Sequence, residues 1–362
     1  MATNTLGAQQ AVVPPVAPRQ TVFSKTAQEW LAGFSFVAPA LIIVIVFIFI
    51  PIIYAFFISF TNWTGLQPPA EAQNVGLANY QALLTNSGIV RTEFFRAVKN
   101  TVYYVLGVVP MQTIVALFLA IIVNQKFLKG RSFFRTAFYF PSITSSIVIS
   151  MIFLWLFNRN GIINYFIGQI AAPLGGYKPE TWLNDPNGLI HNFLRLFGLT
   201  INNAPDWMKT DVLGQSIWQW ISGPSVTMFT IMLLNVWTTS GTLMLIFLAA
   251  LQDIPGQLYE AAAVDGANRW QQFRNITLPM LRPTTFFVIT IGLIGTFQVF
   301  DQVYVISKGQ PAGTTATIAW QLYRNAFRDS QAGLGAATAF VLFVLIGFFT
   351  VIQRRLVGSS PK

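Results

Sequence analysis

Polar side chains suited to binding chemistry lie inside two long apolar stretches, residues 226–251 and 284–304. Their amides, hydroxyls and one carboxylate can donate and accept hydrogen bonds with a solute rich in hydroxyl groups. Aromatic neighbours such as Trp237 and Tyr304 can contact the apolar faces of the same solute. The pattern therefore predicts a site for a neutral carbohydrate, whose candidate residues are Asn235, Thr239, Thr242, Thr296, Gln298 and Asp301.

A structural role is the alternative for each of these residues, because Ser, Thr and Asn commonly form hydrogen bonds between membrane helices. Asp301 lies near the end of its stretch and can be a boundary charge paired with Lys308. We expect Gly292 and Gly295 to serve helix packing rather than solute contact. The single histidine, His191, is expected to be a solvated surface residue.

A second distinctive segment, Gln252 to Pro283, joins the two stretches. Its six charged residues keep it in water, because burying them in a bilayer would cost about 15 kcal/mol. Asp253 is a candidate N-cap for a first helix, which Gly266 can end in a left-handed conformation. A second helix would run until Pro279 ends it. Two short helices meeting at a glycine would form a protrusion that docks on another protein or, as the alternative, lies on the membrane or braces the bundle.

Enzyme, metal and nucleotide chemistry on this chain is not expected. The sequence has no Cys and one His, so neither a metal site nor a catalytic residue is expected. It contains no G-x-x-x-x-G-K-[ST] phosphate loop and so does not bind ATP by that route. The formal charge of +10 comes from 22 scattered Lys and Arg residues without a dense basic run, which argues against nucleic acid as a partner.

The composition predicts an all-α membrane protein. Of 362 residues, 54% are hydrophobic and only 9% are charged, against roughly 25% charged in soluble domains. About 20 apolar residues suffice to cross a bilayer as a helix. Six stretches meet this length, and Asp301 is the only charged residue in them. They run approximately over residues 34–60, 101–123, 138–157, 226–251, 284–304 and 334–352.

Basic residues predict the orientation, because Lys and Arg concentrate in cytoplasmic loops. Lys126, Lys129, Arg131 and Arg135 fill the loop between spans two and three, which is therefore expected in the cytoplasm together with both termini. Residues 1–30 would be a mostly disordered cytoplasmic tail, with a short helix near 24–31, and residues 31–362 the transmembrane domain. Residues 158–225 would form an enlarged outer loop with an amphipathic helix over Leu189 to Phe197, and residues 252–283 a cytoplasmic loop.

The cytoplasmic loop resembles a known family. Its residues Glu260-Ala261-Ala262, Asp265-Gly266-Ala267, and Ile276, Leu278 and Pro279 match the EAA signature of the permease subunits of ABC importers. The longer form of this signature, with Phe273 and Pro283, resembles that of the carbohydrate-uptake branch of the family. The segments FVAPALIIVIVFIFIPIIYAFFISFTNW, FFRAVKNTVYYV and FFRTAFYFPSITSSIVISMIFLWLF also resemble sugar permeases of the maltose and glycerol-3-phosphate type.

The resemblance implies a MetI-like fold and a set of partners. The chain would pair with a second, related permease, and two cytoplasmic ATPase subunits and an extracytoplasmic solute-binding protein would complete the importer. ATP and Mg would bind to the ATPase partner. The resemblance places Asn235, Thr239, Thr242 and Thr296 at the solute site. It assigns the ATPase-coupling role to Glu260, Ala261, Ala262, Asp265, Gly266, Arg269, Phe273, Leu278 and Pro279.

A stand-alone, ion-coupled secondary transporter or channel is the alternative function. Such proteins generally use ionisable groups inside the membrane or discontinuous helices. Asp301 is the one charged residue that the predicted spans offer. The expected location in either case is the inner or plasma membrane, with several spans in the lipid bilayer.

Overall fold

The computed structural model describes residues 25–125, 128–174 and 176–357. The chain divides into two units, Met1–Ala55 and Phe56–Lys362. In the first unit, α1 (Lys25–Val44) and a π-helical turn, η1 (Ile45–Phe49), lead into α2 (Ile50–Ile58), which ends in the second unit. This continuous helix is long and apolar enough to cross a membrane and covers residues 34–58 of the first predicted span. Most of the predicted tail lies outside the described residues. Residues 25–30 are helical, as the short helix predicted near residues 24–31 requires, and they form the start of α1.

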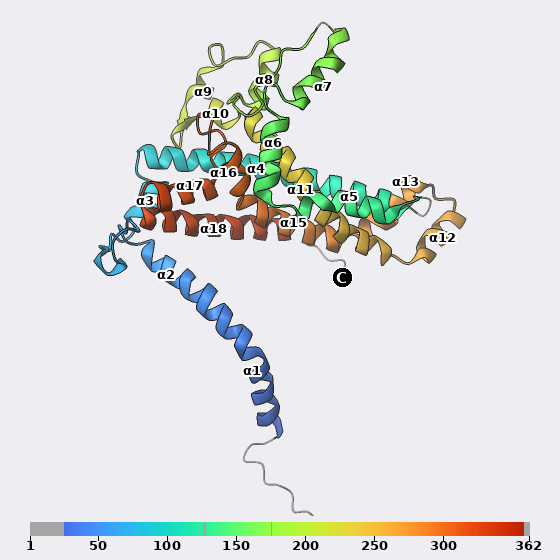
Figure 1. The fold of residues 1–362 in the computed structure, drawn as a ribbon, viewed down its shortest axis with the longest axis horizontal. Helices are drawn as coiled ribbons and strands as arrows, with labels where there is room; N and C mark the ends of the chain where they lie inside the picture. Colours follow the sequence, from blue (N-terminus) through green and yellow to red (C-terminus); the bar gives the residue numbers. More distant parts are fainter. Residues whose placement is uncertain (1–24, 126–127, 175, 358–362) are drawn as a thin grey trace, which may run out of the picture. The chain divides into compact units, whose positions relative to one another are not determined.

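Four further helices of the second unit are long and apolar enough to cross a membrane (Figure 1). They are α4 (Ile89–Asn124), α11 (Val226–Gln252), α15 (Arg282–Phe297) with α16 (Asp301–Ile306), and α18 (Ala332–Val357). Helix α4 begins well before the predicted span at residue 101. Among the described residues there are therefore five such helices, or six when one bent pair is included.

That bent pair replaces the continuous third span predicted over residues 138–157. Helix α5 (Arg131–Ile143) and helix α6 (Ser146–Leu156) meet at 97°. Thr144 and Ser145 between them are extended, with ψ of 145° and 129°. The Thr144 hydroxyl donates to the Phe140 carbonyl at 3.0 Å and so replaces a backbone donor lost at the end of α5. Hydroxyl side chains that compete for backbone groups in this way favour a break, which hydropathy alone does not reveal.

The fifth predicted span, residues 284–304, is also interrupted. Helix α15 ends at Phe297, and α16 begins at Asp301 after a short non-helical segment. The carbonyl of Val299 in this segment accepts a hydrogen bond from the Thr317 hydroxyl at 3.0 Å. A carbonyl group left without a helical partner at the break is therefore hydrogen-bonded by a residue 18 positions later in the chain. Local sequence could not predict this contact.

Helix α11 forms the centre of the second unit. It packs along α4 and α5 and also contacts α15, while α15 packs on α4 and α18. One apolar cluster near its C-terminal half includes Ala116, Ala120, Met244 and Phe247. A second, near its N-terminal half, includes Tyr104, Ile149 and Met228. A third joins α4, α15 and α18. Small residues on α4 let α11 approach closely, which holds the polar face of α11 in place.

The predicted enlarged outer loop contains several ordered elements. They are α7 (Ile162–Ala171), η3 (Ala172–Leu174), α8 (Leu189–Leu196), α9 (Asp206–Lys209), β1 (Asp211–Val212), β2 (Gln215–Ser216) and α10 (Ile217–Trp220). Strands β1 and β2 are antiparallel, with Asp211 opposite Ser216. Helix α8 confirms the helix predicted over residues 189–197.

Buried Asn164 organises the first part of this region. Its Oδ1 accepts hydrogen bonds from Tyr177 Oη and Trp182 Nε1, both at 2.7 Å. Its Nδ2 donates to the carbonyls of Arg159 at 2.8 Å and Glu180 at 2.9 Å. One amide thereby ties the start of α7 to the segment that follows η3.

The remaining elements surround the start of α4. They are η2 (Pro69–Glu71), α3 (Ala78–Leu84), α17 (Ile318–Tyr323) and η5 (Arg324–Arg328). Arg324 forms ion pairs with Glu93 of α4 and, at 3.0 Å, with Asp329. At the C-terminal end of α11 follow α12 (Gly256–Val264), α13 (Arg269–Gln272), the π-helical turn η4 (Phe273–Thr277) and α14 (Leu278–Met280), which lead into α15 (Figure 1).

Candidate functional site

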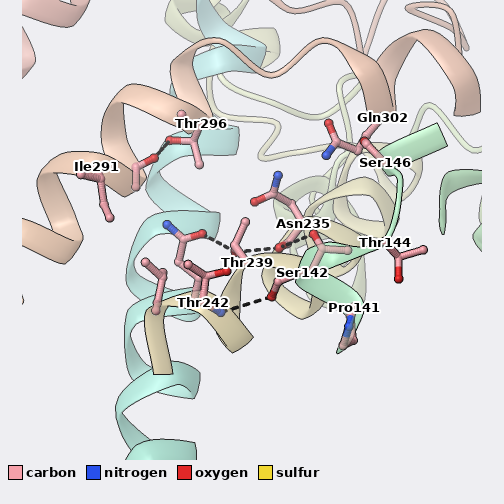
Figure 2. Close-up of a pocket in the computed structure, with 15 residues that line it drawn as sticks. Pro141, Ser142, Thr144, Ser146, Asn235, Thr239, Thr242, Ile291, Thr296 and Gln302 are labelled. Carbon is pink, nitrogen blue, oxygen red and sulfur yellow. Dashed lines mark hydrogen bonds between the residues drawn. The ribbon is translucent and has the colours of Figure 1, made fainter. Parts of the chain in front are cut away.

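A cavity of about 380 Å³ lies among α4, the α5–α6 elbow, α11, α15 and α16 (Figure 2). Hydroxyl and amide side chains make up most of its lining, together with glycines and a few apolar groups. The lining residues are Gln112, Pro141, Ser142, Thr144, Ser146, Asn235, Thr238, Thr239, Thr242, Leu243, Ile291, Gly292, Gly295, Thr296 and Gln302.

Four of the six predicted solute-site residues line this cavity, namely Asn235, Thr239, Thr242 and Thr296. The structure does not place Gln298 or Asp301 in the lining. Both lie at the break between α15 and α16, and both are exposed. Both were chosen as polar residues within one continuous predicted span, and the break between α15 and α16 separates them from the cavity. Asp301 forms no ion pair with Lys308 in the described part of the chain.

The elbow of the bent pair supplies one wall of the cavity, which the sequence analysis did not predict. Pro141, Ser142, Thr144 and Ser146 all face it (Figure 2). The hydroxyl of Ser142 accepts a hydrogen bond from the backbone N–H of Thr242 at 3.2 Å. Gly241 permits this approach, because a Cβ there would lie 2.3 Å from the Phe138 carbonyl oxygen. The break thus brings hydroxyl groups of α5 and α6 beside the polar face of α11.

Helix α15 forms the opposite wall. The Thr296 hydroxyl donates to the Gly292 carbonyl at 2.8 Å, and its lone pairs remain available to a ligand. Gly292 packs against Gln112 of α4 and also lines the cavity, as does Gly295. The predicted packing role is therefore found for Gly292, but both glycines also border the candidate site.

Gln112 on α4 is the principal lining residue that sequence reasoning missed. It is an amide in the middle of an apolar span, and an amide in that position is costly unless it has a partner or a function. Its Oε1 accepts a hydrogen bond from the Thr239 hydroxyl at 2.7 Å. An amide within an apolar stretch was a visible signal in the sequence, but Gln112 lies far along the chain from the other polar residues of the site.

Several buried polar atoms of the lining have no protein partner among the described residues. They are Gln112 Nε2, Ser146 Oγ and Asn235 Oδ1. A buried donor or acceptor without a partner costs about 1–3 kcal/mol, so a ligand or water that pairs with it is stabilised. The lining residues therefore hold both a donor and acceptors for a hydroxyl-bearing molecule, although each of the three atoms is almost fully covered in this structure.

The cavity lining carries no charge, since none of its residues is Asp, Glu, Lys, Arg or His. Nor do the described residues contain a group of three or more His, Cys, Asp or Glu that could hold a metal ion. What the arrangement can do is form neutral hydrogen bonds with a solute.

The predicted coupling protrusion is present as a helical hairpin. Gly266 follows α12 with φ of +79°, as the left-handed cap requires. The backbone N–H groups of Gly266 and Ala267 donate to the carbonyls of Ala263 and Ala262 at 3.1 and 2.8 Å. Asn268 then caps α13 through a reciprocal pair of hydrogen bonds with Gln271. The predicted N-cap is wrong: Pro255 precedes α12, and Asp253 instead ends α11.

Most predicted coupling residues lie on the exposed surface of this hairpin. Ala262 and Phe273 are partly buried, and the exposed ones are Glu260, Ala261, Asp265, Gly266, Arg269, Leu278 and Pro279. Val264 is 88% exposed and Trp270 is 68% exposed. On the inner side, Tyr259 Oη contacts Thr277 Oγ1 at 2.9 Å and joins the two arms of the hairpin. The hairpin is thus braced internally while large apolar groups face outward.

The prediction that Pro279 ends the second helix is wrong. The helical run continues through Pro279 to Met280, because η4 precedes it. In this π turn the N–H of Leu278 donates to the Phe273 carbonyl, five residues back. The wider turn relieves the clash that a proline ring has with the carbonyl four residues earlier.

His191 is not the solvated residue that we expected. Its ring stacks on Trp218, with centroids 4.4 Å apart, and its Nε2 lies 2.9 Å from the Trp218 carbonyl oxygen. Burial lowers the pKa of His191 below its usual value, and the positive charges of Lys99 and Arg195 act in the same direction. The hydrogen bond to Trp218 opposes these effects in part.

Comparison with known proteins gives a consistent result. Residues 112–359 match the family described as "Binding-protein-dependent transport system inner membrane component". The chain is 32% identical to the arabinooligosaccharides transport system permease protein AraP of Bacillus subtilis, over 94% of this chain and 92% of that protein. It is 30% identical to the trehalose/maltose transport system permease protein MalF of Thermococcus litoralis, over 91% and 94%.

Among solved structures, the fold is similar to a chain of a bacterial ABC transporter involved in the import of the acidic polysaccharide alginate. The TM-score is 0.65 at 22% identity, over 91% of this chain and 96% of that one. A related structure of the alginate transporter, in complex with an alginate pentasaccharide-bound periplasmic protein, gives a TM-score of 0.66 at 21% identity, over 92% and 98%. These likenesses confirm the fold. The apolar helices and the full-length relatives together show that the chain belongs to the family of inner membrane components of binding-protein-dependent transport systems, among the permeases of sugar ABC transporters.

Proposed function

We propose that the chain is one permease subunit of an ATP-driven importer that receives a neutral carbohydrate from an extracytoplasmic binding protein. The uncharged, hydrogen-bonding cavity among α4, α11, α15 and the α5–α6 elbow carries this proposal. A second permease would complete the translocation path, and two ATPase subunits would bind ATP and Mg. In this proposal the chain crosses the inner membrane six times, counting α5 and α6 as one span, with both termini in the cytoplasm.

The hairpin of α12 and α13 would transmit force from the ATPase. Its cap at Gly266 and the Tyr259–Thr277 contact hold its two arms together, so a push at its tip would move α11 and α15. These two helices also carry Asn235, Thr239 and Thr296 of the cavity. Movement of the hairpin would therefore change the cavity directly, as alternating access requires.

The test is to purify the chain with its partner subunits and reconstitute the complex in liposomes with ATP inside. We expect uptake of a radiolabelled neutral oligosaccharide that requires both ATP and the binding protein, and stimulation of ATP hydrolysis by the loaded binding protein. Carbohydrate uptake by this chain alone, driven by an ion gradient, would instead establish a secondary transporter. No carbohydrate uptake under any of these conditions would reject the proposed function.

A further inference from the structure

We propose that Gln112 is a solute-binding residue of the cavity and that it selects neutral hydroxyl groups over carboxylates. This inference rests on the proposed function, since it assigns the class of solute that the same cavity accepts. Gln112 lies on α4, a helix that contributes no other residue to the lining. Its role therefore does not follow from the polar faces of α11 and α15.

The amide of Gln112 is buried and oriented by the protein. The residue is 1% exposed, and its Oε1 accepts the hydrogen bond from Thr239 at 2.7 Å. Its Nε2 has no partner among the described residues, although it is buried. This amide has one satisfied end and one free end in the wall of a cavity, and it can donate to a ligand when a small movement of the wall uncovers Nε2.

The backbone of α15 makes room for this amide. A Cβ at Gly292 would lie 2.3 Å from Gln112 Nε2, so only glycine at position 292 allows the observed placement. Gln112 thus meets α15 at Gly292 and α11 at Thr239. Two helices fix the amide, which limits the loss of side-chain freedom when a solute binds.

The second free atom in the cavity is complementary to the first. Asn235 is 8% exposed, and its Oδ1 makes no hydrogen bond of normal geometry among the described residues, although the buried Tyr104 hydroxyl lies beside this amide. A sugar hydroxyl both donates and accepts, so the hydroxyls of one sugar can satisfy Gln112 Nε2 and Asn235 Oδ1. A carboxylate can only accept, and it brings a charge that no cationic side chain of the lining balances. The cavity should therefore reject uronic acids.

The chain offers a matched control at Gln353 of α18. This glutamine is 6% exposed, its Oε1 accepts from the Thr290 hydroxyl at 3.0 Å, and its Nε2 donates to the Phe286 carbonyl at 3.2 Å. Gln353 forms the same kind of Gln–Thr hydrogen bond between two helices as Gln112 does. Both ends of its amide are hydrogen-bonded, however, and it does not line the cavity. Replacing it tests the cost of losing a buried glutamine without touching the site.

The experiment measures equilibrium binding of tritiated maltotriose, arabinotriose and trigalacturonate to the purified permease–ATPase complex without the binding protein. For the wild type we expect binding of at least one neutral trisaccharide and none of trigalacturonate. Gln112→Met, which keeps the side-chain length, should weaken neutral binding about tenfold, the loss of one hydrogen bond. Gln353→Met should change it less than twofold.

Two results would overturn the inference while the proposed function stands. One is that the Gln112→Met and Gln353→Met complexes bind the neutral trisaccharides with equal affinity while both still import sugar with ATP. The other, which needs no variant to fold, is trigalacturonate binding by the wild type as tight as that of the neutral sugars. Loss of all ATP-dependent carbohydrate uptake by the wild type would reject the proposed function instead.

Discussion

Side chains with one free hydrogen-bonding atom characterise the cavity at the scale of single residues. Gln112 and Asn235 each keep an unpaired amide atom, and Ser146 keeps a hydroxyl without a partner among the described residues. Inside a membrane protein such atoms are unfavourable until a ligand or water pairs with them. A solute that pairs with these atoms removes this cost, which favours its binding.

His191 gives the first prediction. Its lowered pKa means that the folded state favours the neutral imidazole. As pH falls through about 6.5, the unfolded form of this segment takes up a proton before the folded form does. The contribution of His191 to the stability of the outer segment is therefore fully present above this pH, and it is lost as the pH falls toward the pKa of the folded state. Protection against hydrogen exchange at Ile221 and Ser222, whose N–H groups bond within this segment, should decrease in the wild type as the pH falls from about 7 to 5, once the intrinsic pH dependence of exchange is corrected for.

The control is His191→Gln, which does not titrate and can still donate to the Trp218 carbonyl. Its exchange at the same two amides, corrected for the intrinsic pH dependence of exchange, should not vary across this range. If protection changes with pH in the same way in the two proteins, His191 is not the cause of the change.

The residues of the site could be predicted only in part. Asn235, Thr239 and Thr242, chosen as polar residues in an apolar stretch, lie on the unbroken helix α11 and line the cavity. Gln298 and Asp301 lie at a break between two helices that hydropathy does not reveal, and they do not line the cavity. Gln112 was missed because its partners, Thr239 and Gly292, lie on other helices far along the chain.

Short hinges and turns decide the geometry at the scale of elements. The six apolar stretches were predictable from composition, but the 97° elbow between α5 and α6 was not. Hydropathy measures how apolar a stretch is and does not register a change of direction within it. The hairpin was better predicted, because a glycine cap acts locally.

Gly266 gives the second prediction. Its φ of +79° costs an L-residue about 1–2 kcal/mol, and nothing contacts the position where a Cβ would be. Gly266→Ala should therefore reorient the start of α13 without disturbing the core. We expect sugar uptake to fall at least tenfold while ATP hydrolysis persists without coupling. Gly130→Ala is the matched control, since Gly130 has φ of +77° and is equally free of neighbours, and it should retain uptake. Equal losses in the two variants would argue against a specific coupling role.

Asn164 gives the third prediction. Asn164→Leu removes the acceptor of Tyr177 Oη and Trp182 Nε1. Leaving these two donors unpaired should destabilise the segment by about 2–4 kcal/mol. Limited proteolysis should then cleave between η3 and α8 faster than in the wild type, while the helical bundle stays intact. Asn203→Leu offers a control in the same region, because Asn203 bonds only in an exposed turn. If the two variants are cleaved at the same rate, the central role of Asn164 is refuted.

At the scale of the whole molecule, the two candidate functional regions lie at different parts of α11. The cavity draws on Asn235 to Leu243 in the middle of this helix, and the hairpin follows its C-terminus. Both regions also involve α15, which follows the hairpin. One pair of helices therefore connects the proposed ATPase contact with the proposed solute site.

The absence of Cys from the sequence permits a direct test of orientation, the fourth prediction. A single cysteine at Glu260 should react with a membrane-impermeant maleimide only after the cell is opened. A cysteine at Asp206 of α9 should react in intact spheroplasts, because residues 158–225 are expected outside. Both wild-type residues are exposed, so access through the protein does not limit either reaction. Labelling of Glu260→Cys from outside would reverse the proposed topology and exclude the ATPase contact.

The elbow at Thr144 and Ser145 has a consequence for hydration. Two extended residues interrupt helical hydrogen bonding within a stretch that is otherwise apolar enough to span the bilayer. Backbone of this kind cannot face hydrocarbon and persists only against protein or water. Since Thr144 borders the cavity, the elbow marks a point where lipid must be excluded. The bend therefore requires protein or water around its two residues, and water in the cavity beside Thr144 would meet this need.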